Sequence, residues 1–181
     1  MEEITLFDKT FKTFIPHEKI EQAIDKVAEK LNQDFKDCED IPVILCILNG
    51  SIMFTSELMK RLTFKCAFAS MKLSSYSGTE STGEVKQLLG PTSDLKGKRV
   101  IVVEDIVDTG NTIVALDKLI REMGAKDVKI CTMLLKPDMY DKDIKLDYVA
   151  MEIPNAFIVG FGLDYNELGR NYKDIYVIKE Q

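Results

Sequence analysis

Continuous apolar runs that alternate with helix-like segments constrain the fold of this chain more than any other feature. The runs "PVILCIL" (42–48), "VIVV" (100–103) and "VKICTMLL" (128–135) contain few polar residues, as is typical of strands covered on both faces. Apolar residues at helical spacing fill 18–32, 51–61 and 113–123, which predicts amphipathic helices there. This alternation predicts an α/β fold with a mostly parallel central sheet flanked by helices.

Weaker signals complete the expected architecture. Residues 64–73 and the later stretches "DYVAMEI", "AFIVG" and "DIYVI" have the composition of strands, and Pro16-His17 marks a helix entry. The hydrophilic stretch "SSYSGTESTGE" (74–84) has no core-forming pattern, so we expect a mobile loop. A length of 181 residues suits one domain, 1–181, with a single core.

Composition narrows the possible partners. The net charge of -6 argues against nucleic acid or an anionic membrane as the main partner, because both require a basic surface. No apolar run approaches the roughly 20 residues of a membrane span, and the N-terminus lacks a signal-peptide core. Cysteines at 38, 46, 66 and 131 show no metal-binding spacing. We therefore expect reduced thiols in a cytoplasmic protein, and any metal would be a hard cation with oxygen ligands.

The segment "VVEDIVDTGNT" (102–112) is the most unusual local feature. Glu104 and Asp105 follow an apolar strand directly, at the kind of strand end where parallel α/β sheets bind ligands. The next segment supplies free backbone N–H groups and hydroxyls at a helix start, which suits a phosphate. Its residues are Asp108, Thr109, Gly110, Asn111 and Thr112.

The acids need a different ligand group, because carboxylates repel phosphate. Glu104 and Asp105 suit the two hydroxyls of a ribose, and Asp108 lies closer to the helix start, where it could face a reacting group. A 5′-phosphorylated ribose would therefore satisfy the whole segment. The alternative is a strand end with solvated acids and an N-cap at Asp108 or Thr112.

The same segment resembles the phosphoribosyl-pyrophosphate motif of the type I phosphoribosyltransferases. Three further stretches resemble the hypoxanthine-guanine branch of that family: "LNGS" (48–51), "SYSGTESTGEVK" (75–86) and "FIVGFGLDYNELGR" (157–170). The resemblance implies the fold of that family, with a small hood and a mobile active-site loop. It also implies transfer of phosphoribose from phosphoribosyl pyrophosphate to hypoxanthine or guanine, which yields IMP or GMP and pyrophosphate, with Mg²⁺ as cofactor.

The resemblance also implies roles for particular residues. Asp108 would be the general base for purine N7, and Glu104 and Asp105 would hold the ribose and contribute to the metal site. The pyrophosphate would meet Arg170 and four residues of two loops: Asn49, Gly50, Ser75 and Tyr76. Many family members have Lys-Gly in place of Asn49-Gly50, next to a non-proline cis peptide.

The purine subsite follows from the same resemblance. Lys136 would donate to the 6-oxo group, Phe157 would stack on the ring, and the backbone of Ile158 would meet the base edge. Asp164 would lie at this site and hold a magnesium ion. On residue patterns alone, Lys136 could equally be a solvated lysine, Phe157 a core residue and Arg170 part of a surface ion pair.

Two other functions remain open on the sequence. One is a non-catalytic regulator of the same fold that senses phosphoribosyl pyrophosphate and binds nucleic acid. The other is a transferase for xanthine or another base. The family resemblance further implies a homodimer or homotetramer.

Overall fold

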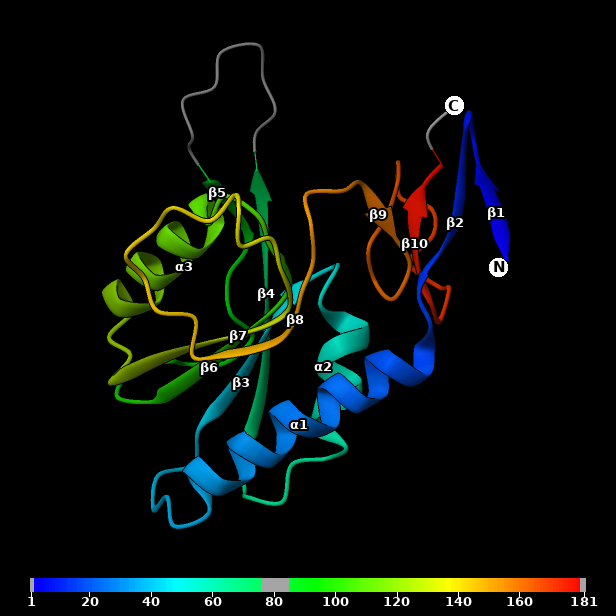
Figure 1. Ribbon diagram of the computed structural model, residues 1–181. Helices are drawn as coiled ribbons and strands as arrows, with labels where there is room; N and C mark the ends of the chain where they lie inside the picture. Colours follow the sequence, from blue (N-terminus) through cyan, green and yellow to red (C-terminus); the bar gives the residue numbers. More distant parts are fainter. Residues whose placement is uncertain (1, 76–84, 180–181) are drawn as a thin grey trace.

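The central sheet confirms the predicted α/β architecture. The computed structural model describes residues 2–75 and 85–179. Six strands lie in the order β5-β4-β3-β6-β7-β8, in which β5 is antiparallel to β4 and all other neighbours are parallel (Figure 1). They are β3 (Val43–Leu48), β4 (Ala67–Ser75), β5 (Val85–Leu89), β6 (Arg99–Val107), β7 (Asp127–Leu135) and β8 (Tyr148–Glu152).

Helices cover both faces of this sheet. Helices α1 (His17–Phe35) and α2 (Ile52–Met59) pack on one face and α3 (Asn111–Glu122) packs on the other. Successive residues of β6 point to opposite faces: Ile101 joins the core under α1 and α2, whereas Val102 joins the core under α3. Burial on both faces explains why the strands are continuous apolar runs. None of the helices in the described part of the chain is long and apolar enough to cross a bilayer.

Some element boundaries differ from those expected. Strand β6 continues to Val107, so Glu104 and Asp105 lie within a strand and not beyond its end. Helix α3 begins at Asn111, two residues before the predicted start. Strand β4 begins at Ala67, three residues after its predicted start.

A second, smaller sheet forms the hood. It comprises β1 (Glu3–Leu6), β2 (Lys9–Ile15), β9 (Ile158–Val159) and β10 (Ile175–Ile178), paired antiparallel in the order β1-β2-β10-β9. Figure 1 shows this hood beside the central sheet, with β2 from the start of the chain between β1 and the last strand, β10. The sequence analysis did not predict the hairpin of β1 and β2.

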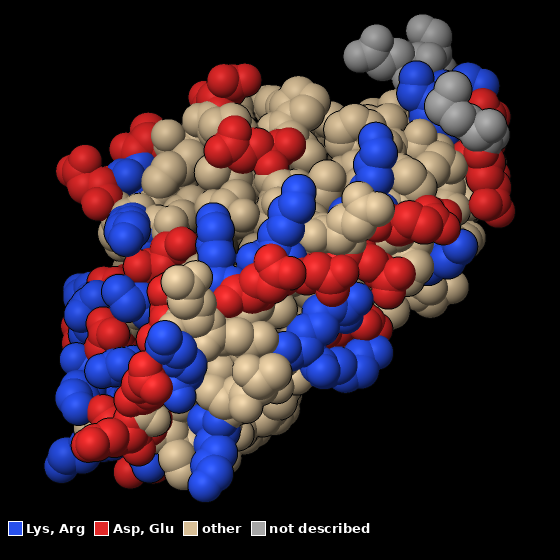
Figure 2. Space-filling view, turned by 60° about the horizontal axis from the view of Figure 1, so that its bottom comes forward, with Lys and Arg blue, Asp and Glu red and all other residues tan. Residues whose placement is uncertain are grey.

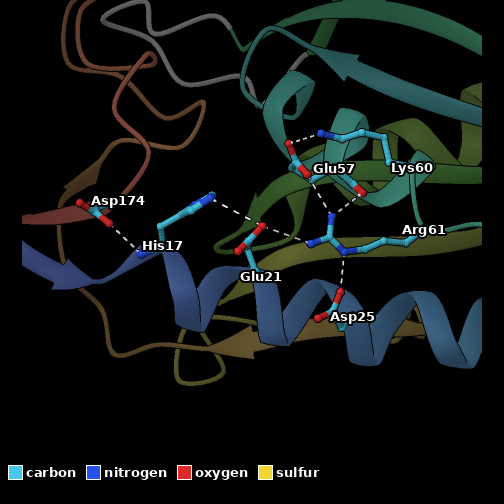
Figure 3. A network of polar contacts seen from close by, with 7 residues as sticks. All are labelled: His17, Glu21, Asp25, Glu57, Lys60, Arg61 and Asp174. Carbon is cyan, nitrogen blue, oxygen red and sulfur yellow. Dashed lines mark hydrogen bonds and ion pairs between the residues drawn. The ribbon is translucent and has the colours of Figure 1, made fainter.

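The hood is joined to α1 by a buried carboxylate. Pro16 makes no side-chain capping bond at the start of α1. The backbone N–H of His17 instead donates to Oδ1 of Asp174 at 2.7 Å (Figure 3). Asp174 directly precedes β10 and is buried. A carboxylate from the end of the chain thus caps α1, where the helix dipole favours negative charge.

An ion-pair network continues from α1 to α2. The Arg61 guanidinium donates to Asp25 at 2.5 Å and to Glu57 at 3.0 Å, and it lies 3.4 Å from Glu21. Lys60 also pairs with Glu57, at 2.7 Å (Figure 3). Glu21 lies 3.7 Å from the imidazole of His17. The network therefore connects the hood, α1 and α2, the helix that follows the Asn49-Gly50 loop.

Candidate active site at the carboxyl end of the sheet

The last third of β6 is open on one side. Strand β3 pairs with β6 only as far as Cys46 and Val103, whereas β7 pairs with it up to Val107. Glu104 is nevertheless buried, which rules out the reading of a solvated acid for that residue. Beyond Val103, β3 no longer pairs with β6. A ligand can therefore approach the carboxylates of Glu104 and Asp105 from that side of β6.

Burial makes these two carboxyl groups harder to ionise. It raises the pKa of Glu104 well above its ordinary value, and the neighbouring Asp105 adds to this effect. It also raises the pKa of Asp105, while backbone N–H groups and the cation of Arg170 oppose the rise. Two carboxyl groups that resist ionisation are stabilised by ligand hydroxyl donors or by a cation.

Two glycine segments pack closely around the Asp105 side chain. A Cβ atom added to Gly50 would lie 1.7 Å from Oδ2 of Asp105, and one added to Gly162 would lie 2.0 Å from the carbonyl oxygen of Gly50. The peptide bond between Leu48 and Asn49 is cis. Gly50 thus lies against Asp105 of β6, whereas the Asn49 residue is exposed.

The loop after β6 forms a pocket of about 290 Å³ that is lined by residues 104–113. Gly110 caps α3 in the left-handed region, at φ +82°, and no side chain of the described residues caps this helix start. A Cβ atom on Gly110 would lie 2.5 Å from the ring of Tyr140. The alternative of an N-cap at Asp108 or Thr112 is therefore wrong, and the N–H groups of the first turn stay available for an anion.

Lys136 reaches this loop from the end of β7. Its ammonium group lies 2.8 Å from Oδ2 of Asp108 and 3.2 Å from Oδ1 of Asn155. Lys136 is only 8% exposed, which contradicts the reading of a solvated lysine. The sequence analysis did not single out Asn155, because one asparagine after a strand carries no distinctive pattern.

Asp108 keeps one acceptor free. Its side chain is 45% exposed, yet Oδ1 is buried and has no hydrogen-bond partner within the described residues. Oδ2 is held by Lys136. Such a carboxylate can accept a proton or an N–H bond from a ligand in the pocket.

The segment that follows Asn155 carries the predicted purine contacts. Phe157 is 45% exposed and lies 5.7 Å, edge to face, from Tyr165. The reading of Phe157 as a core residue is therefore wrong. Ile158 is buried as the first residue of β9. Lys136 donates hydrogen bonds to both Asn155 and Asp108. The segment that begins at Asn155 therefore lies near Asp108.

Arg170 and Asp164 pair with each other on the hood side. Arg170 lies 2.6 Å from Oδ1 of Asp164 and donates to the Gly162 carbonyl at 2.7 Å. Asp164 also accepts the N–H of Glu167 at 2.7 Å. Six residues here have positive φ: Gly160, Phe161, Gly162, Asn166, Glu167 and Gly169. Three of these are not glycines, and non-glycine residues in this sparsely populated region cluster at active and ligand-binding sites.

Two predicted site residues lie at the edge of the described part of the chain. Ser75 ends β4, but its side chain is not described, and Tyr76 and the predicted mobile loop lie outside the described residues.

Within residues 2–75 and 85–179, no three acidic, cysteine or histidine side chains gather closely enough to hold a metal. The four cysteines are free thiols, as predicted.

Comparison with known proteins decides the family. The profile of the phosphoribosyl transferase domain matches residues 12–166 of this chain. The chain belongs to the phosphoribosyltransferase family. Its central sheet, flanking helices and antiparallel hood are the fold of the type I members of that family.

Close relatives extend over nearly the whole chain. A phosphoribosyltransferase of Streptococcus pneumoniae, named for hypoxanthine and guanine, is 40% identical over 171 residues, which is 94% of each chain. A solved hypoxanthine phosphoribosyltransferase from Staphylococcus aureus is 36% identical with a TM-score of 0.86, over 93% of this chain and 91% of that one. A hypoxanthine-guanine phosphoribosyltransferase from Bacillus anthracis has a TM-score of 0.84 at 32% identity, over 93% and 97% of the two chains.

Proposed function

We propose that this phosphoribosyltransferase is a purine-salvage enzyme that uses phosphoribosyl pyrophosphate and hypoxanthine or guanine. The products are IMP or GMP and pyrophosphate. The Oδ1 of Asp108, which has no hydrogen-bond partner among the described residues and lies beside the buried ammonium of Lys136, carries the proposal. A 6-oxopurine presents an imidazole N–H and an adjacent carbonyl oxygen, which match an acceptor and a cationic donor side by side.

The phosphoribose would occupy the pocket of residues 104–113. Glu104 and Asp105 would accept the 2′ and 3′ hydroxyls. The backbone of Asp108 to Thr112 and the hydroxyls of Thr109 and Thr112 would bind the 5′-phosphate at the start of α3. This arrangement fixes the sugar so that its anomeric carbon faces the base, which lowers the entropic part of the barrier.

The purine would lie between Lys136 and Phe157. Asp108 takes the N7 proton as the other imidazole nitrogen attacks C1′, a contribution of roughly 10²–10⁴-fold. Lys136 donates to the 6-oxo group, and the exposed ring of Phe157 stacks on the base. Adenine presents an amino donor at position 6, so a lysine there disfavours it.

Magnesium is the proposed cofactor, held by Asp164 with help from Glu104 and Asp105. The carboxylate oxygens of these residues are the hard ligands that magnesium prefers, and Asp164 lies near enough to add to the rise that burial causes in the pKa of Asp105; the diphosphate and water would supply the other ligands. When bound, magnesium neutralises charge on the leaving diphosphate. Arg170 would pair with the same group through its guanidinium fork, and Asn49, Gly50, Ser75 and Tyr76 would complete the diphosphate contacts.

A nucleic-acid-binding regulator is less well supported. On the face seen in Figure 2, positive and negative side chains are interspersed and do not form a single basic patch. The net charge is -6. Both features disfavour binding to a polyanion. A homodimer or homotetramer stays a prediction.

An absorbance assay tests the proposed function. The enzyme would receive phosphoribosyl pyrophosphate and magnesium with hypoxanthine, guanine, xanthine or adenine in turn. We expect turnover of hypoxanthine or guanine in clear preference to adenine, and loss of activity in excess chelator. Preference for adenine or for a non-purine base would contradict the proposal, and activity that persists in chelator would contradict the metal assignment.

A further inference from the structure

Four aromatic rings from two distant parts of the chain, the N-terminal hairpin and residues 157–165, meet in the hood. Phe11 of β2 is fully buried, with its ring centroid 6.1 Å from that of Phe157 and 6.3 Å from that of Tyr165. Phe157 and Tyr165 meet at 5.7 Å with an interplanar angle of 88°. Phe7 adds a further edge-to-face contact, 5.9 Å and 82° from Tyr165. The N-terminal hairpin therefore supplies half of an aromatic cluster that includes the proposed purine-stacking ring.

Tyr165 is the centre of this cluster and is held at several points. Its hydroxyl donates to Oδ1 of Asp8 at 2.8 Å, and the ammonium of Lys9 lies 5.6 Å from its ring centroid. Its backbone exchanges hydrogen bonds with Leu168 at 2.9 and 3.1 Å. The two residues inside that turn have φ +49° and +70°, the pattern of a type I′ turn. The hairpin tip and this turn together fix the Tyr165 ring.

Phe7 is an unexpected residue for its position. It lies in the tight turn between β1 and β2 with φ +51°, a conformation that glycine adopts far more readily. It is also 61% exposed, so its ring contributes little to a hydrophobic core. Neither the backbone nor burial favours phenylalanine here. Its contact with Tyr165 is the interaction that gives the side chain a role.

We propose that Phe7 and Tyr165 are positioning residues for the purine subsite, and that the N-terminal hairpin orients Phe157 through them. The proposal rests on the proposed function, in which Phe157 stacks on the base. Phe157 keeps 45% of its surface exposed while its edge packs on Tyr165. A ring fixed in this way loses less rotational freedom when a planar base binds, which increases affinity for the base.

Substitution of Phe7 by glycine tests this role. Glycine suits the φ of this turn and removes an exposed ring, so we expect an unchanged thermal midpoint. An edge-to-face pair corresponds to a factor of about 2- to 13-fold in affinity. The KM for hypoxanthine should rise by that factor, while kcat and the KM for phosphoribosyl pyrophosphate stay within about twofold. Phe7→Tyr keeps the ring and should restore the KM for hypoxanthine.

Leu168→Ala is the matched control, because it removes another exposed apolar side chain, 47% exposed, from the turn that holds Tyr165. Its KM for hypoxanthine should equal that of the parent. The inference is overturned if Phe7→Gly leaves this KM unchanged, or if both substrates' KM values rise together. Tyr165→Phe, which loses only the bond to Asp8, provides a second test with the same expected direction. The activity of the parent enzyme tests the proposed function separately, because the inference concerns only the ratio of the variant's KM for hypoxanthine to that of the parent.

Discussion

Replacing Lys136 with methionine separates the proposed contact with the base from the packing of the site. The lysine ammonium lies 2.8 Å from Asp108 and 3.2 Å from Asn155, so a base bound beside Asp108 would come within its reach. A hydrogen bond from a charged donor contributes about 1.5–3 kcal/mol. Its loss in the transition state should lower kcat/KM for hypoxanthine by about 10- to 150-fold.

The same change should leave the fold intact. Lys136 is buried and its partner Asp108 is 45% exposed, so water can solvate the carboxylate once the ammonium is gone. Methionine fills a similar volume without a charge to desolvate. We therefore expect the free energy of unfolding to change by about 1 kcal/mol or less, as measured by urea denaturation.

The ratio of hypoxanthine to adenine use gives the sharpest readout. Lys136→Met removes the donor that disfavours a 6-amino group, so this ratio should fall. Lys129→Met serves as the control. Lys129 lies in β7, the strand that Lys136 directly follows, and pairs with Asp147 at 3.3 Å, but it takes no part in the proposed site. An unchanged ratio in Lys136→Met, or an equal fall in the control, would refute the reasoning.

Four further outcomes follow from the structure. Asp108→Asn should lower kcat by about 10²–10⁴-fold with little change in the KM for phosphoribosyl pyrophosphate; near-normal turnover would remove Asp108 as the base. Gly162→Ala should destabilise the fold by at least 1–3 kcal/mol, because its Cβ would lie 2.0 Å from the Gly50 carbonyl oxygen and its φ is +97°; a parent-like thermal midpoint would contradict this. Asp174→Ala should reduce the free energy of unfolding by about 0.5–2 kcal/mol, since it uncaps α1, and identical urea curves would show that the cap is not used. Burial raises the pKa of Glu104 well above its ordinary value of 4.5, so the folded state binds the carboxyl proton more tightly than the unfolded state does. The free energy of unfolding should therefore fall as the pH rises from about 4.5 through the folded-state pKa. Glu104→Gln should lessen that fall, and equal slopes in the two proteins would argue against it.

The central sheet was predictable because its strands are buried on both faces. That environment leaves continuous apolar runs such as residues 42–48, and the helices between them keep helical spacing. The end of β6 was placed too early, because Glu104 and Asp105 look like the end of an apolar strand. Their strand conformation depends on pairing with β7, which cannot be read from local sequence.

The hood was harder to predict because its contacts connect the two ends of the chain. Strand β2 pairs with β10, and Asp174 caps a helix that begins at His17. The hydrogen bond from Lys136 to Asn155 was also hard to predict, because it joins residues that are 19 positions apart in the sequence. Such contacts leave no periodic pattern in the sequence, whereas the loop from Asp108 to Thr112 combines its residue types within five positions.

The central claim is that the chain joins a phosphoribosyl group to a purine. Mass spectrometry of a reaction with hypoxanthine, phosphoribosyl pyrophosphate and magnesium tests it most directly, together with a count of the pyrophosphate released. We predict IMP and pyrophosphate in equal amounts, and neither in excess chelator. Release of ribose 5-phosphate without nucleotide, or binding of phosphoribosyl pyrophosphate without turnover, would contradict the account.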